Sequence, residues 1–518
     1  MTVGVARPTA GVPAPTGEPR AIRIDPADDV AVAVHTVPAG ESVRVGADRI
    51  VAREEIPAGH KVALRDLAPG DPVHKYGFPI GLASAAIARG AWVHSHNLDT
   101  RLGGVLEYRY APGERRAEAR PAALPTFMGY RRTNGRAGTR NEIWIVNTVG
   151  CVNTAADRIA RVMGERLAGQ VDGVHAFAHP YGCSQLGDDL KNTQRVLAGL
   201  VRHPNAGGVL VLGLGCENNQ MASLLEAAGD VDRDRLRFFN MQDVMDELDE
   251  GSSAISELAA RVAADRREAC PVSDLVLGHK CGGSDGFSGI SANAVLGRIA
   301  DRLTAQGGGV LLTEVPEMFG AEQVLMNRAA DDGVFRDVAA MINEFKQYFL
   351  DHGQPVYENP SPGNKAGGLT TLEEKSLGAI QKGGHATVQR VLRYGAPVPA
   401  GEGGGGLSLL EAPGNDAVSS TAMVASGATL LLFTTGRGTP LGFPVPTVKV
   451  SSNSEIARRK PHWIDFDCGP LLDGSATMDQ LADELFALVL EVASGRSLAN
   501  NEQHGYREIA IWKEGVTL

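Results

Sequence analysis

Two kinds of hydrophobic pattern divide the chain. Over residues 22–100, short runs of alternating apolar and polar residues, such as AVAVHTV, SVRVGA and KVALRDL, are separated by turns rich in proline and glycine. This pattern is typical of strands and predicts a small all-β module. After residue 125, nearly continuous apolar runs such as EIWIVNTVG and GGVLVLGLG alternate with amphipathic helical stretches. This second pattern predicts an α/β body, doubly wound around parallel strands and arranged in two α/β lobes.

The remaining segments define the predicted domain boundaries. Residues 1–21 contain almost no large apolar side chains and are predicted to be a disordered tail. Residues 101–125 show no clear periodicity and are predicted to be a linker. The first α/β lobe is predicted over residues 126–268 and the second over residues 269–518, with a glycine-rich insert at residues 401–406.

Composition and charge narrow the class of protein. The chain has 518 residues, with 50 Lys and Arg against 61 Asp and Glu, so its formal net charge is −11. This balance argues against nucleic acid and anionic membranes as partners, and no apolar run of about 20 residues predicts a membrane span. The 6 cysteines are too few for a disulfide framework in a chain of this length. We therefore expect a cytoplasmic protein, and we expect a homodimer because two-fold dimers are the commonest oligomers of soluble proteins.

Four cysteines follow predicted strands at intervals that match βα units of about 30 residues. They are Cys151, Cys183, Cys216 and Cys281. Because ligands of open parallel sheets bind at the carboxyl ends of the strands, we expect all four thiols at one binding rim. Small cysteines that merely fit tight turns are the alternative. Polar neighbours favour the binding rim, because they are costly to bury without a partner; they include Ser184, Gln185, Glu217, His279 and Lys280.

The β module carries a candidate site of its own in the segments VHKYGFPIG and WVHSHN. The first contains Lys75 and Tyr76, and the second contains His94, His96 and Asn97. Two histidines at positions i and i+2 of a strand face the same side, which favours chelation of one divalent metal. An ordinary hydrogen-bonded histidine pair and direct contact with a substrate are the two alternatives.

Further polar residues lie between glycines and prolines in the second lobe. They include Glu314, Glu317, Asn364, Lys365, Asn415 and Asp416. In TTGRGTPLGF the glycines let the backbone around Arg437 approach a ligand, and a guanidinium can bind both oxygens of a carboxylate. A surface arginine in a flexible turn is the alternative. The sequence has no GxGxxG, no Walker-A lysine motif and no GxSxG elbow, so we expect neither a nucleotide cofactor nor a hydrolase triad.

Long motifs carry a resemblance to a known family. They are HPYGCSQLGDD, VLGLGCENNQ, GHKCGGSDGFSG, NPSPGNKAGGLTTLEEKSLG and TTGRGTPLGFPVPTVKVSSN. These segments resemble the altronate and galactarate dehydratases, a family of hydro-lyases, and the β module resembles the SAF (β-clip) domain of that family. HPYGCSQLGDD and GCENNQ look closer to the altronate dehydratases. The same architecture, split over two chains, is similar to sulfolactate sulfo-lyase.

The resemblance implies loss of water from a sugar acid, most simply D-altronate, to give a 2-keto-3-deoxy acid. It also implies a divalent metal, usually Fe²⁺, with Mn²⁺ or Mg²⁺ as alternatives, because a cation stabilises the enediolate formed by proton removal. The metal ligands expected on this basis are His94, His96, Cys216 and Glu217. The expected acid–base groups are Lys75, His279, Lys280 and Lys365. The expected substrate-binding residues are Tyr76, Asn97, Ser184, Gln185, Asn364, Asn415, Asp416 and Arg437.

Other functions remain open from the sequence. Within the family, the substrate alternatives are galactarate dehydration and sulfolactate cleavage. A dehydratase could instead use an iron–sulfur cluster with three ligands from Cys151, Cys183, Cys216 and Cys281, because such clusters are held by thiolates. In a different class, the chain would be a sugar-acid binding protein without catalytic activity, since the β-clip resembles modules that serve for binding.

Overall fold

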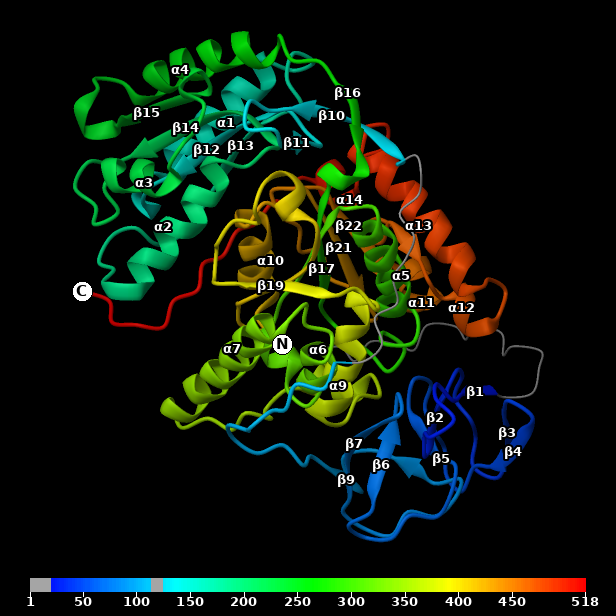
Figure 1. Ribbon diagram of the computed structural model, residues 1–518. Coiled ribbons are helices and arrows are strands. Elements are labelled where there is room, and N and C mark those ends of the chain that lie inside the picture. Colours follow the sequence, from blue (N-terminus) through cyan, green and yellow to red (C-terminus); the bar gives the residue numbers. More distant parts are fainter. Residues whose placement is uncertain (1–19, 113–123) are drawn as a thin grey trace, which may run out of the picture.

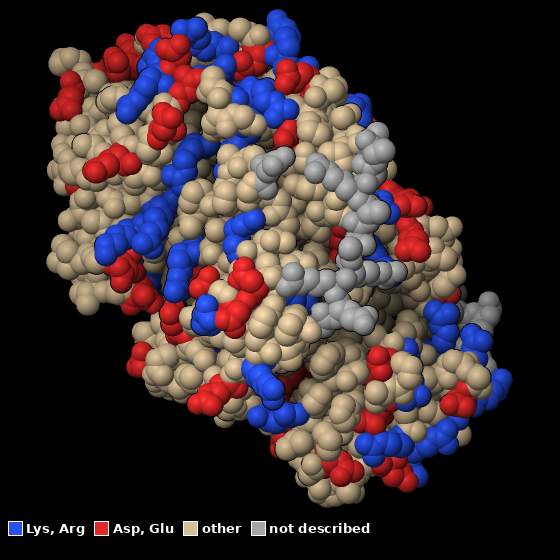
Figure 2. Space-filling view, in the orientation of Figure 1, with Lys and Arg blue, Asp and Glu red and all other residues tan. Residues whose placement is uncertain are grey.

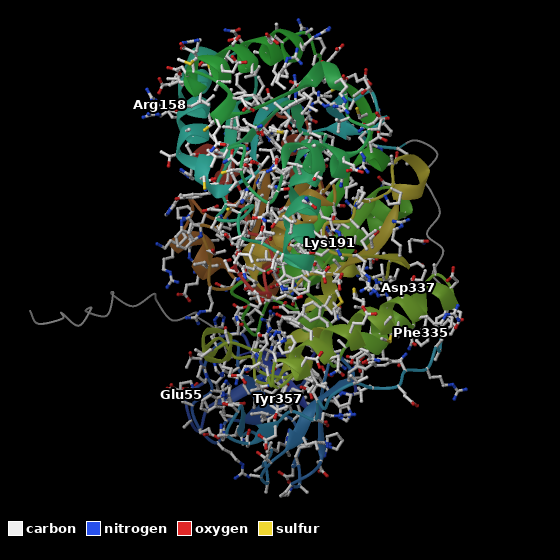
Figure 3. All side chains as sticks on the ribbon, turned by 90° about the vertical axis from the view of Figure 1, so that its left-hand side faces the viewer. Glu55, Arg158, Lys191, Phe335, Asp337 and Tyr357 are labelled. Atoms are coloured by element: carbon white, nitrogen blue, oxygen red, sulfur yellow. The ribbon has the colours of Figure 1, made fainter. Side chains whose placement is uncertain are left out.

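The computed structural model of the chain describes residues 20–112 and 124–518 (Figure 1). The predicted tail at residues 1–21 and the middle of the predicted linker therefore lie largely outside the described residues. The described chain forms an N-terminal β domain at one end, the second α/β lobe in the centre and the first α/β lobe at the other end. In the side view of Figure 3, Glu55 lies in the β domain and Arg158 in the far α/β lobe.

The N-terminal domain is built only of short strands, which confirms the all-β prediction. A six-stranded sheet has the order β4-β3-β1-β2-β5-β8 and a three-stranded sheet the order β6-β7-β9. Alternation of apolar and polar positions buries Val43, Ile50 and Val62 in a common core. The strands are β1 (Arg20–Ile22), β2 (Val30–Ala33), β3 (Ser42–Val45), β4 (Asp48–Val51), β5 (Lys61–Ala63), β6 (Pro72–Lys75), β7 (Phe78–Ala83), β8 (Trp92–Val93) and β9 (Leu98–Asp99).

The first α/β lobe contains a four-stranded parallel sheet in the order β13-β12-β14-β15. Its strands are β12 (Glu142–Asn147), β13 (Val174–Phe177), β14 (Ala206–Gly213) and β15 (Leu236–Asn240), and its helices are α1 (Asn153–Arg166), α2 (Gly187–Val201), α3 (Met221–Ala228) and α4 (Glu247–Val262). Along β12, Ile143 and Ile145 belong to one core cluster, while Trp144 and Val146 belong to another. Both faces are therefore buried, as the nearly continuous apolar run predicts.

The second α/β lobe contains a seven-stranded parallel sheet in the order β19-β20-β18-β17-β21-β22-β23. Its strands are β17 (Val276–Cys281), β18 (Gly309–Leu312), β19 (Val388–Leu392), β20 (Gly406–Leu410), β21 (Leu430–Thr435), β22 (Thr447–Ser451) and β23 (Phe466–Asp467). The helices are α5 (Ala292–Ala305), α6 (Glu322–Met326), α7 (Asp332–Asp351), α8 (Pro362–Ala366), α9 (Leu372–Ala379), α10 (Asp416–Ala425), α11 (Ser454–Arg459), α12 (Pro470–Asp473), α13 (Met478–Ala493) and α14 (Asn500–His504). The two parallel sheets confirm the predicted α/β body.

The two lobes share a core but not a sheet. Helix α2 of the first lobe packs closely on α10 of the second, because a Cβ on Gly199 would lie 2.3 Å from the carbonyl oxygen of Ala425. Between the lobes, β16 (Glu268–Pro271) pairs antiparallel with β10 (Thr126–Arg131), which also pairs with β11 (Ala137–Gly138). This antiparallel pairing ends the first sheet before β17 begins.

The division into two sheets corrects one prediction. Cys151, Cys183 and Cys216 follow strands of the first sheet, but Cys281 ends β17 in the second sheet. The four thiols therefore do not share one rim. The spacing between Cys216 and Cys281 matches two βα units, but the antiparallel strand β16 lies within it. The pattern of apolar runs gives no sign of this strand.

The outer surface carries charges of both signs. On the face shown in Figure 2, Lys and Arg side chains are interspersed with Asp and Glu. Over residues 20–112 and 124–518, no helix is both long enough and apolar enough to cross a membrane.

Candidate active site

A group of charged side chains is buried at the carboxyl end of the second sheet. It combines three lysines, three carboxylates and one thiol, and we call it the lysine–carboxylate cluster: Lys280, Lys375, Lys382, Glu314, Glu317, Asp416 and Cys281. Lys280 and Cys281 end β17, Glu314 follows β18, and Asp416 begins α10. The carboxyl ends of parallel strands meet at one edge, so residues distant in sequence come together here.

Each lysine of the cluster is bonded to an acidic group or to the thiol. Lys280 Nζ donates hydrogen bonds to Glu314, to Asp416 Oδ1 at 2.6 Å and to the Cys281 carbonyl oxygen at 2.7 Å. Lys375 Nζ lies 2.7 Å from Glu317 Oε1. Three ammonium groups thus face three carboxylates, which offsets much of the cost of burying these charges.

The remaining lysine of the cluster is bonded to its thiol. Lys382 Nζ donates to Cys281 Sγ at 2.8 Å, and the thiol lies 3.3 Å from Glu317 Oε2, to which it donates. Burial and the neighbouring Glu317 raise the pKa of Cys281 to about 11, so the group is a neutral thiol at neutral pH.

The two glutamates of the cluster differ in their affinity for a proton. Burial and the nearby charge of Glu317 raise the pKa of Glu314, although Lys280 and Lys382 oppose this effect. Burial would also raise the pKa of Glu317, but Lys375 and Lys280 outweigh it and lower that pKa. Glu314 also has a positive φ of 69°, a strained backbone conformation for a residue with a side chain. Such a pair, with one carboxyl holding its proton and the other ionised, suits acid–base chemistry.

A cavity of about 460 Å³ opens onto the cluster. Glu317, Lys375 and Asp416 line it directly, and the Asp416 side chain is 37% exposed. Asn364 also lines the cavity, donating to the Ser284 carbonyl oxygen at 2.8 Å and accepting from Lys375 at 3.3 Å. The cavity therefore offers one ammonium, three carboxylates and two amides to a small polar ligand, since Glu358 and Asn359 also line it. Glu314 and Lys280 are buried behind them.

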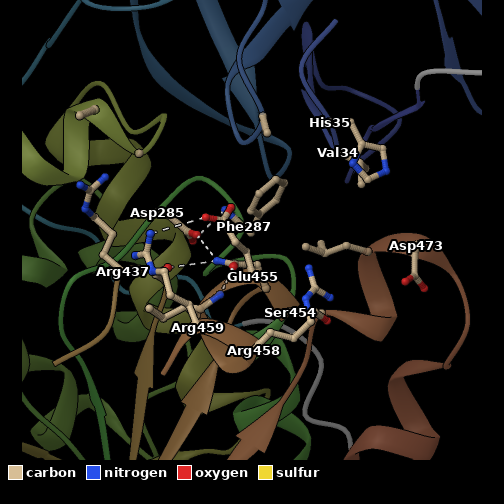
Figure 4. A pocket seen from close by; sticks show the side chains of 18 residues that line it. Val34, His35, Asp285, Phe287, Arg437, Ser454, Glu455, Arg458, Arg459 and Asp473 are labelled. Carbon is tan, nitrogen blue, oxygen red and sulfur yellow. Dashed lines mark hydrogen bonds and ion pairs between the residues drawn. The ribbon is translucent and has the colours of Figure 1, made fainter. Parts of the chain in front are cut away.

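A second cavity, of about 590 Å³, lies between the β domain and the second lobe (Figure 4). Its lining includes Arg437, Arg458 and Arg459 from the second lobe and His35 from the β domain. Arg437, the predicted carboxylate-binding residue, is therefore one of three arginines in this cavity. The carboxylates at its wall include Asp285, which accepts hydrogen bonds from Ser288, Ser452 and Asn453.

The β domain is held against the second lobe by a buried ion network. Glu374 lies 2.8 Å from Lys75 Nζ and 2.9 Å from Lys61 Nζ. Burial would raise the pKa of Glu374, but the two lysines outweigh it and hold that pKa well below its ordinary value. Lys75, predicted as an acid–base group, is thus a charge partner inside the domain interface. Tyr76 lies at the same interface, where its hydroxyl group lies close to Gly289 and Gly378.

The histidines of the β domain also contact the second lobe, but not in the predicted geometry. Strand β8 ends at Val93, and His94 to Asn97 form a turn closed by a hydrogen bond of 2.9 Å from His94 N to Asn97 Oδ1. The inference that His94 and His96 face one side of a strand is therefore wrong. His94 Nε2 bonds to the Lys365 carbonyl oxygen at 2.9 Å, and Nδ1 bonds to Ser95. Metal binding by His94 and His96 stays a prediction.

The structure does not bring the four expected metal ligands together. Cys216 and Glu217 follow β14 in the first lobe, which lies at the opposite end of the molecule from the β domain (Figure 1). Glu217 instead closes its own loop, accepting from Gly215 N at 2.7 Å, from Leu214 N at 3.1 Å and from Thr148. Burial would raise the pKa of Glu217, but these hydrogen bonds outweigh it and lower that pKa.

The remaining predicted residues fall into two groups. Ser184 and Gln185 lie just before α2 in the first lobe, whereas the cluster lies in the second lobe. His279 is buried under the cluster and bonds through Nδ1 to the Lys382 carbonyl oxygen at 2.8 Å; burial lowers its pKa to about 4, so it is neutral. Asn415 caps α10 by accepting from two backbone amides. Asn97, Asn415 and His279 thus bond to backbone atoms of neighbouring segments. Asn364 lines the cavity, and Asp416 and Lys280 belong to the lysine–carboxylate cluster.

Sequence reasoning missed Lys375 and Lys382. Both follow the motif NPSPGNKAGG, in a segment where almost every residue is buried. Lys375 lies in α9 and Lys382 in the 3-10 turn Ile380–Gly383 that follows it. The available signal was two lysines flanking a stretch of low polarity, because buried ammonium groups need acidic partners.

The cluster can be tested for its fit to a divalent metal. Atoms of Cys281, Glu314 and Glu317 that could act as ligands lie within 4.8 Å of one another. However, each of these three side chains already bonds to a lysine of the cluster. A divalent cation would enter among three ammonium groups, so the cluster in this charge state does not fit a resident metal. The lysines themselves supply positive charge at the cavity.

Comparison with known proteins identifies the family. Three family models match: the altronate/galactarate dehydratase SAF domain over residues 19–101, the D-galactarate dehydratase/altronate hydrolase second domain over residues 129–263, and the D-galactarate/altronate dehydratase C-terminal domain over residues 272–517. All three models describe parts of sugar-acid dehydratases, so the chain is an enzyme of this class. The chain belongs to the altronate/galactarate dehydratase family.

Individual relatives cover nearly the whole chain. An altronate dehydratase of Bacillus subtilis is 50% identical over 96% of this chain and 99% of its own length. An altronate dehydratase of Escherichia coli is also 50% identical, with the same shares covered. A galactarate dehydratase (L-threo-forming) of Escherichia coli is 34% identical over 95% of this chain and 96% of its own length.

Proposed function

We propose that the protein dehydrates a sugar acid, D-altronate, to a 2-keto-3-deoxy sugar acid in the cavity above the lysine–carboxylate cluster. The higher identity to altronate dehydratases, 50% against 34% for the galactarate dehydratase, supports altronate as the substrate. The observation that carries the proposal is a buried set of lysines and carboxylates with unequal proton affinities, opening into a cavity of about 460 Å³. This arrangement supports proton transfer to and from a small anion.

In the proposed reaction, a carboxylate of the cavity removes the proton beside the substrate's carboxylate. We assign this role to Asp416, because it is partly exposed and its side chain bonds to Lys280 at 2.6 Å. Negative charge then develops on the substrate's carboxylate oxygens, and Lys375 at the cavity wall stabilises it. The proton beside a carboxylate is only weakly acidic, so this stabilisation is the main demand on the site.

The same reaction needs a proton for the departing hydroxyl group, which leaves as water. Glu314 holds a proton more firmly than an ordinary glutamate, and it shares Lys280 with Asp416. We therefore assign the proton store to Glu314, connected to the cavity through Lys280 and Asp416. The enol that remains becomes the 2-keto acid by proton rearrangement, so no oxidant or reductant is required.

Other expectations remain predictions. Divalent iron is expected from the family resemblance. In the cluster, Glu314 Oε2 has no hydrogen-bond partner among the described residues, but Cys281, Glu314 and Glu317 each bond to a lysine. A homodimer and a cytoplasmic location are likewise predictions from the sequence.

The test is a substrate screen with three anions. Purified protein is incubated with D-altronate, galactarate and sulfolactate, alone and with Fe²⁺, Mn²⁺ or Mg²⁺, and 2-keto-3-deoxy acid and sulfite are measured. We expect keto-acid formation with altronate as the best substrate, and a loss of at least about 100-fold in Lys375→Met. A faster reaction with galactarate or sulfolactate would replace the substrate assignment. Binding of sugar acids without product under all conditions would contradict the catalytic proposal.

A further inference from the structure

Three exposed cysteines lie at the carboxyl edge of the first lobe's sheet. Cys151, Cys183 and Cys216 follow β12, β13 and β14, which are neighbours in the order β13-β12-β14. Their side chains are exposed, whereas the other cysteines, Cys270, Cys281 and Cys468, are buried. Free cysteine is among the most buried residue types, so three exposed thiols at one edge need an explanation.

Backbone contacts hold the three cysteine loops against one another. Gly150 N donates to the Tyr181 carbonyl oxygen at 2.8 Å, and Asn219 N donates to the Gly182 carbonyl oxygen at 2.9 Å. The Asn219 side chain donates to the Thr148 carbonyl oxygen at 2.9 Å. A Cβ on Gly182 would lie 2.1 Å from that same Thr148 oxygen, so only glycine permits this approach. The mutual position of the three thiols is therefore fixed by the loops.

Helix N-termini gather beside the same three thiols. Each cysteine lies a few residues before a helix, and α1, α2 and α3 begin at Asn153, Gly187 and Met221. The unpaired amide groups and the dipole at a helix N-terminus favour negatively charged ligands. A metal cluster held by thiolates is such a ligand.

Each cysteine loop also has a buried polar atom without a hydrogen-bond partner within the part of the chain that the structure describes. These atoms are Asn147 Oδ1, Gln185 Nε2 and Asn219 Oδ1. An unsatisfied buried polar atom costs about 1–3 kcal/mol, so three in one place indicate a missing partner. In addition, Gln242 Nε2 donates to Cys216 Sγ at 3.7 Å, and hydrogen bonds to sulfur ligands are typical of metal centres.

The spacing of the thiols distinguishes a single ion from a cluster. Over residues 20–112 and 124–518, Cys281, Glu314 and Glu317 are the one set of three ligand-type residues whose atoms all lie within 4.8 Å. At least two of the three exposed sulfur atoms are therefore farther apart than 4.8 Å. A tetrahedral zinc ion, with bonds of about 2.3 Å, requires sulfurs less than about 4 Å apart. A cluster, with iron and sulfide between the thiolates, spans a wider gap.

We propose that Cys151, Cys183 and Cys216 ligate an iron–sulfur cluster of the [4Fe–4S] type. Such a cluster takes four ligands. The three exposed cysteines would hold three of its irons and leave the fourth ligand to another group. The proposal does not depend on the lysine–carboxylate cluster or on the identity of the substrate.

The experiment is anaerobic reconstitution of the full chain with ferrous iron and sulfide. Iron and acid-labile sulfide are then counted and the visible absorption spectrum recorded. We expect about four irons and about four sulfides per chain. Most of the iron and sulfide should be lost in each of the variants Cys151→Ser, Cys183→Ser and Cys216→Ser. The control Cys270→Ala, at a buried position in another sheet, should retain both.

Two results would overturn the proposal. One is a reconstituted protein with no acid-labile sulfide, including one that binds a single zinc or iron ion. The other is a cluster that persists when all three rim cysteines are replaced by serine, or that is lost when only Cys270 is changed. Because the rim thiols are exposed, the serine variants should keep the urea midpoint of the metal-free protein, which separates loss of ligands from loss of fold.

Discussion

The two parallel sheets carry cysteines at the same structural position, yet the surroundings of the thiols differ completely. At the rim of the first lobe, Cys151, Cys183 and Cys216 are exposed and lie beside helix N-termini. At the rim of the second lobe, Cys281 is buried between Lys382 and Glu317, and its pKa is raised to about 11. A thiol kept neutral by burial is a poor metal ligand, because the thiolate is the ligand form.

This comparison shows why strand-end position alone does not define chemistry. Both rims have glycine turns and polar loops, so a sequence pattern makes them look alike. What separates them is charge: the second rim collects three ammonium groups around its thiol and carboxylates, while the first collects thiols and amide side chains. We therefore assign proton transfer to the second rim and metal binding to the first.

The largest expected effect follows from removing the central ammonium of the second rim. In Lys280→Met, Glu314 and Asp416 lose their common partner, and Glu314 remains buried. Breaking a buried ion pair in this way costs about 3–5 kcal/mol of unfolding free energy. Turnover should fall by at least about 100-fold. Urea denaturation and a keto-acid assay measure both effects.

The matched change at the first rim should leave the fold almost untouched. Cys183→Ser replaces an exposed side chain. The free energy of unfolding of the metal-free protein should therefore fall by no more than about 0.5 kcal/mol. If Lys280→Met were as stable as the wild type and Cys183→Ser were strongly destabilised, the contrast between the two rims would be wrong.

A second prediction concerns pH. Burial and Glu317 raise the pKa of Glu314, so the folded protein holds this proton more firmly than the unfolded chain does. The resulting stability is fully present below the ordinary glutamate pKa of 4.5 and is lost as the pH rises through the raised value. For each pH unit between the ordinary and the raised pKa, the free energy of unfolding falls by about 1.4 kcal/mol. Glu314→Gln carries no titrating proton, so its urea midpoint should lack this decline.

Turnover provides the second readout of the same variant. If Glu314 returns the proton to the leaving hydroxyl group, Glu314→Gln should be at least about 100-fold slower at every pH. An unchanged rate with an unchanged pH profile would remove Glu314 from the proton path and leave it as a structural partner of Lys280.

The fold could largely be predicted from sequence, and the site only in part. Strands β12, β14, β17, β21 and β22 are nearly continuous apolar runs, and this is the pattern of buried parallel strands. Two lobes divided at residue 268 were predicted, but the antiparallel strand β16 between the two sheets has no such pattern. Cys281 was therefore placed at the same rim as the other three cysteines. His94 and His96 show the limit of spacing rules: i and i+2 share a face only in a strand, and the Asn97 side chain closes a turn there instead.

A third prediction tests whether Glu217 belongs to a metal site. Its carboxylate accepts hydrogen bonds from Thr148 and from the amides of Leu214 and Gly215. Glu217→Gln keeps the shape of the side chain but removes its charge. We expect the free energy of unfolding to fall by about 1–3 kcal/mol. Iron and sulfide content after reconstitution should equal that of the wild type. Loss of iron in a variant that is otherwise folded would restore Glu217 as a ligand.

The smallest effect is expected in the arginine-lined cavity between the β domain and the second lobe. Arg437 is exposed and shares this cavity with Arg458 and Arg459, so its removal leaves two guanidinium groups to attract an anion (Figure 4). Arg437→Ala should raise KM for the sugar acid by no more than about tenfold, equal to about 1.4 kcal/mol, with kcat and the urea midpoint unchanged. Arg458→Ala is the matched control and should act in the same direction. If kcat falls while KM stays constant, Arg437 acts on the reacting centre, and the division between an attracting cavity and a catalytic rim is wrong.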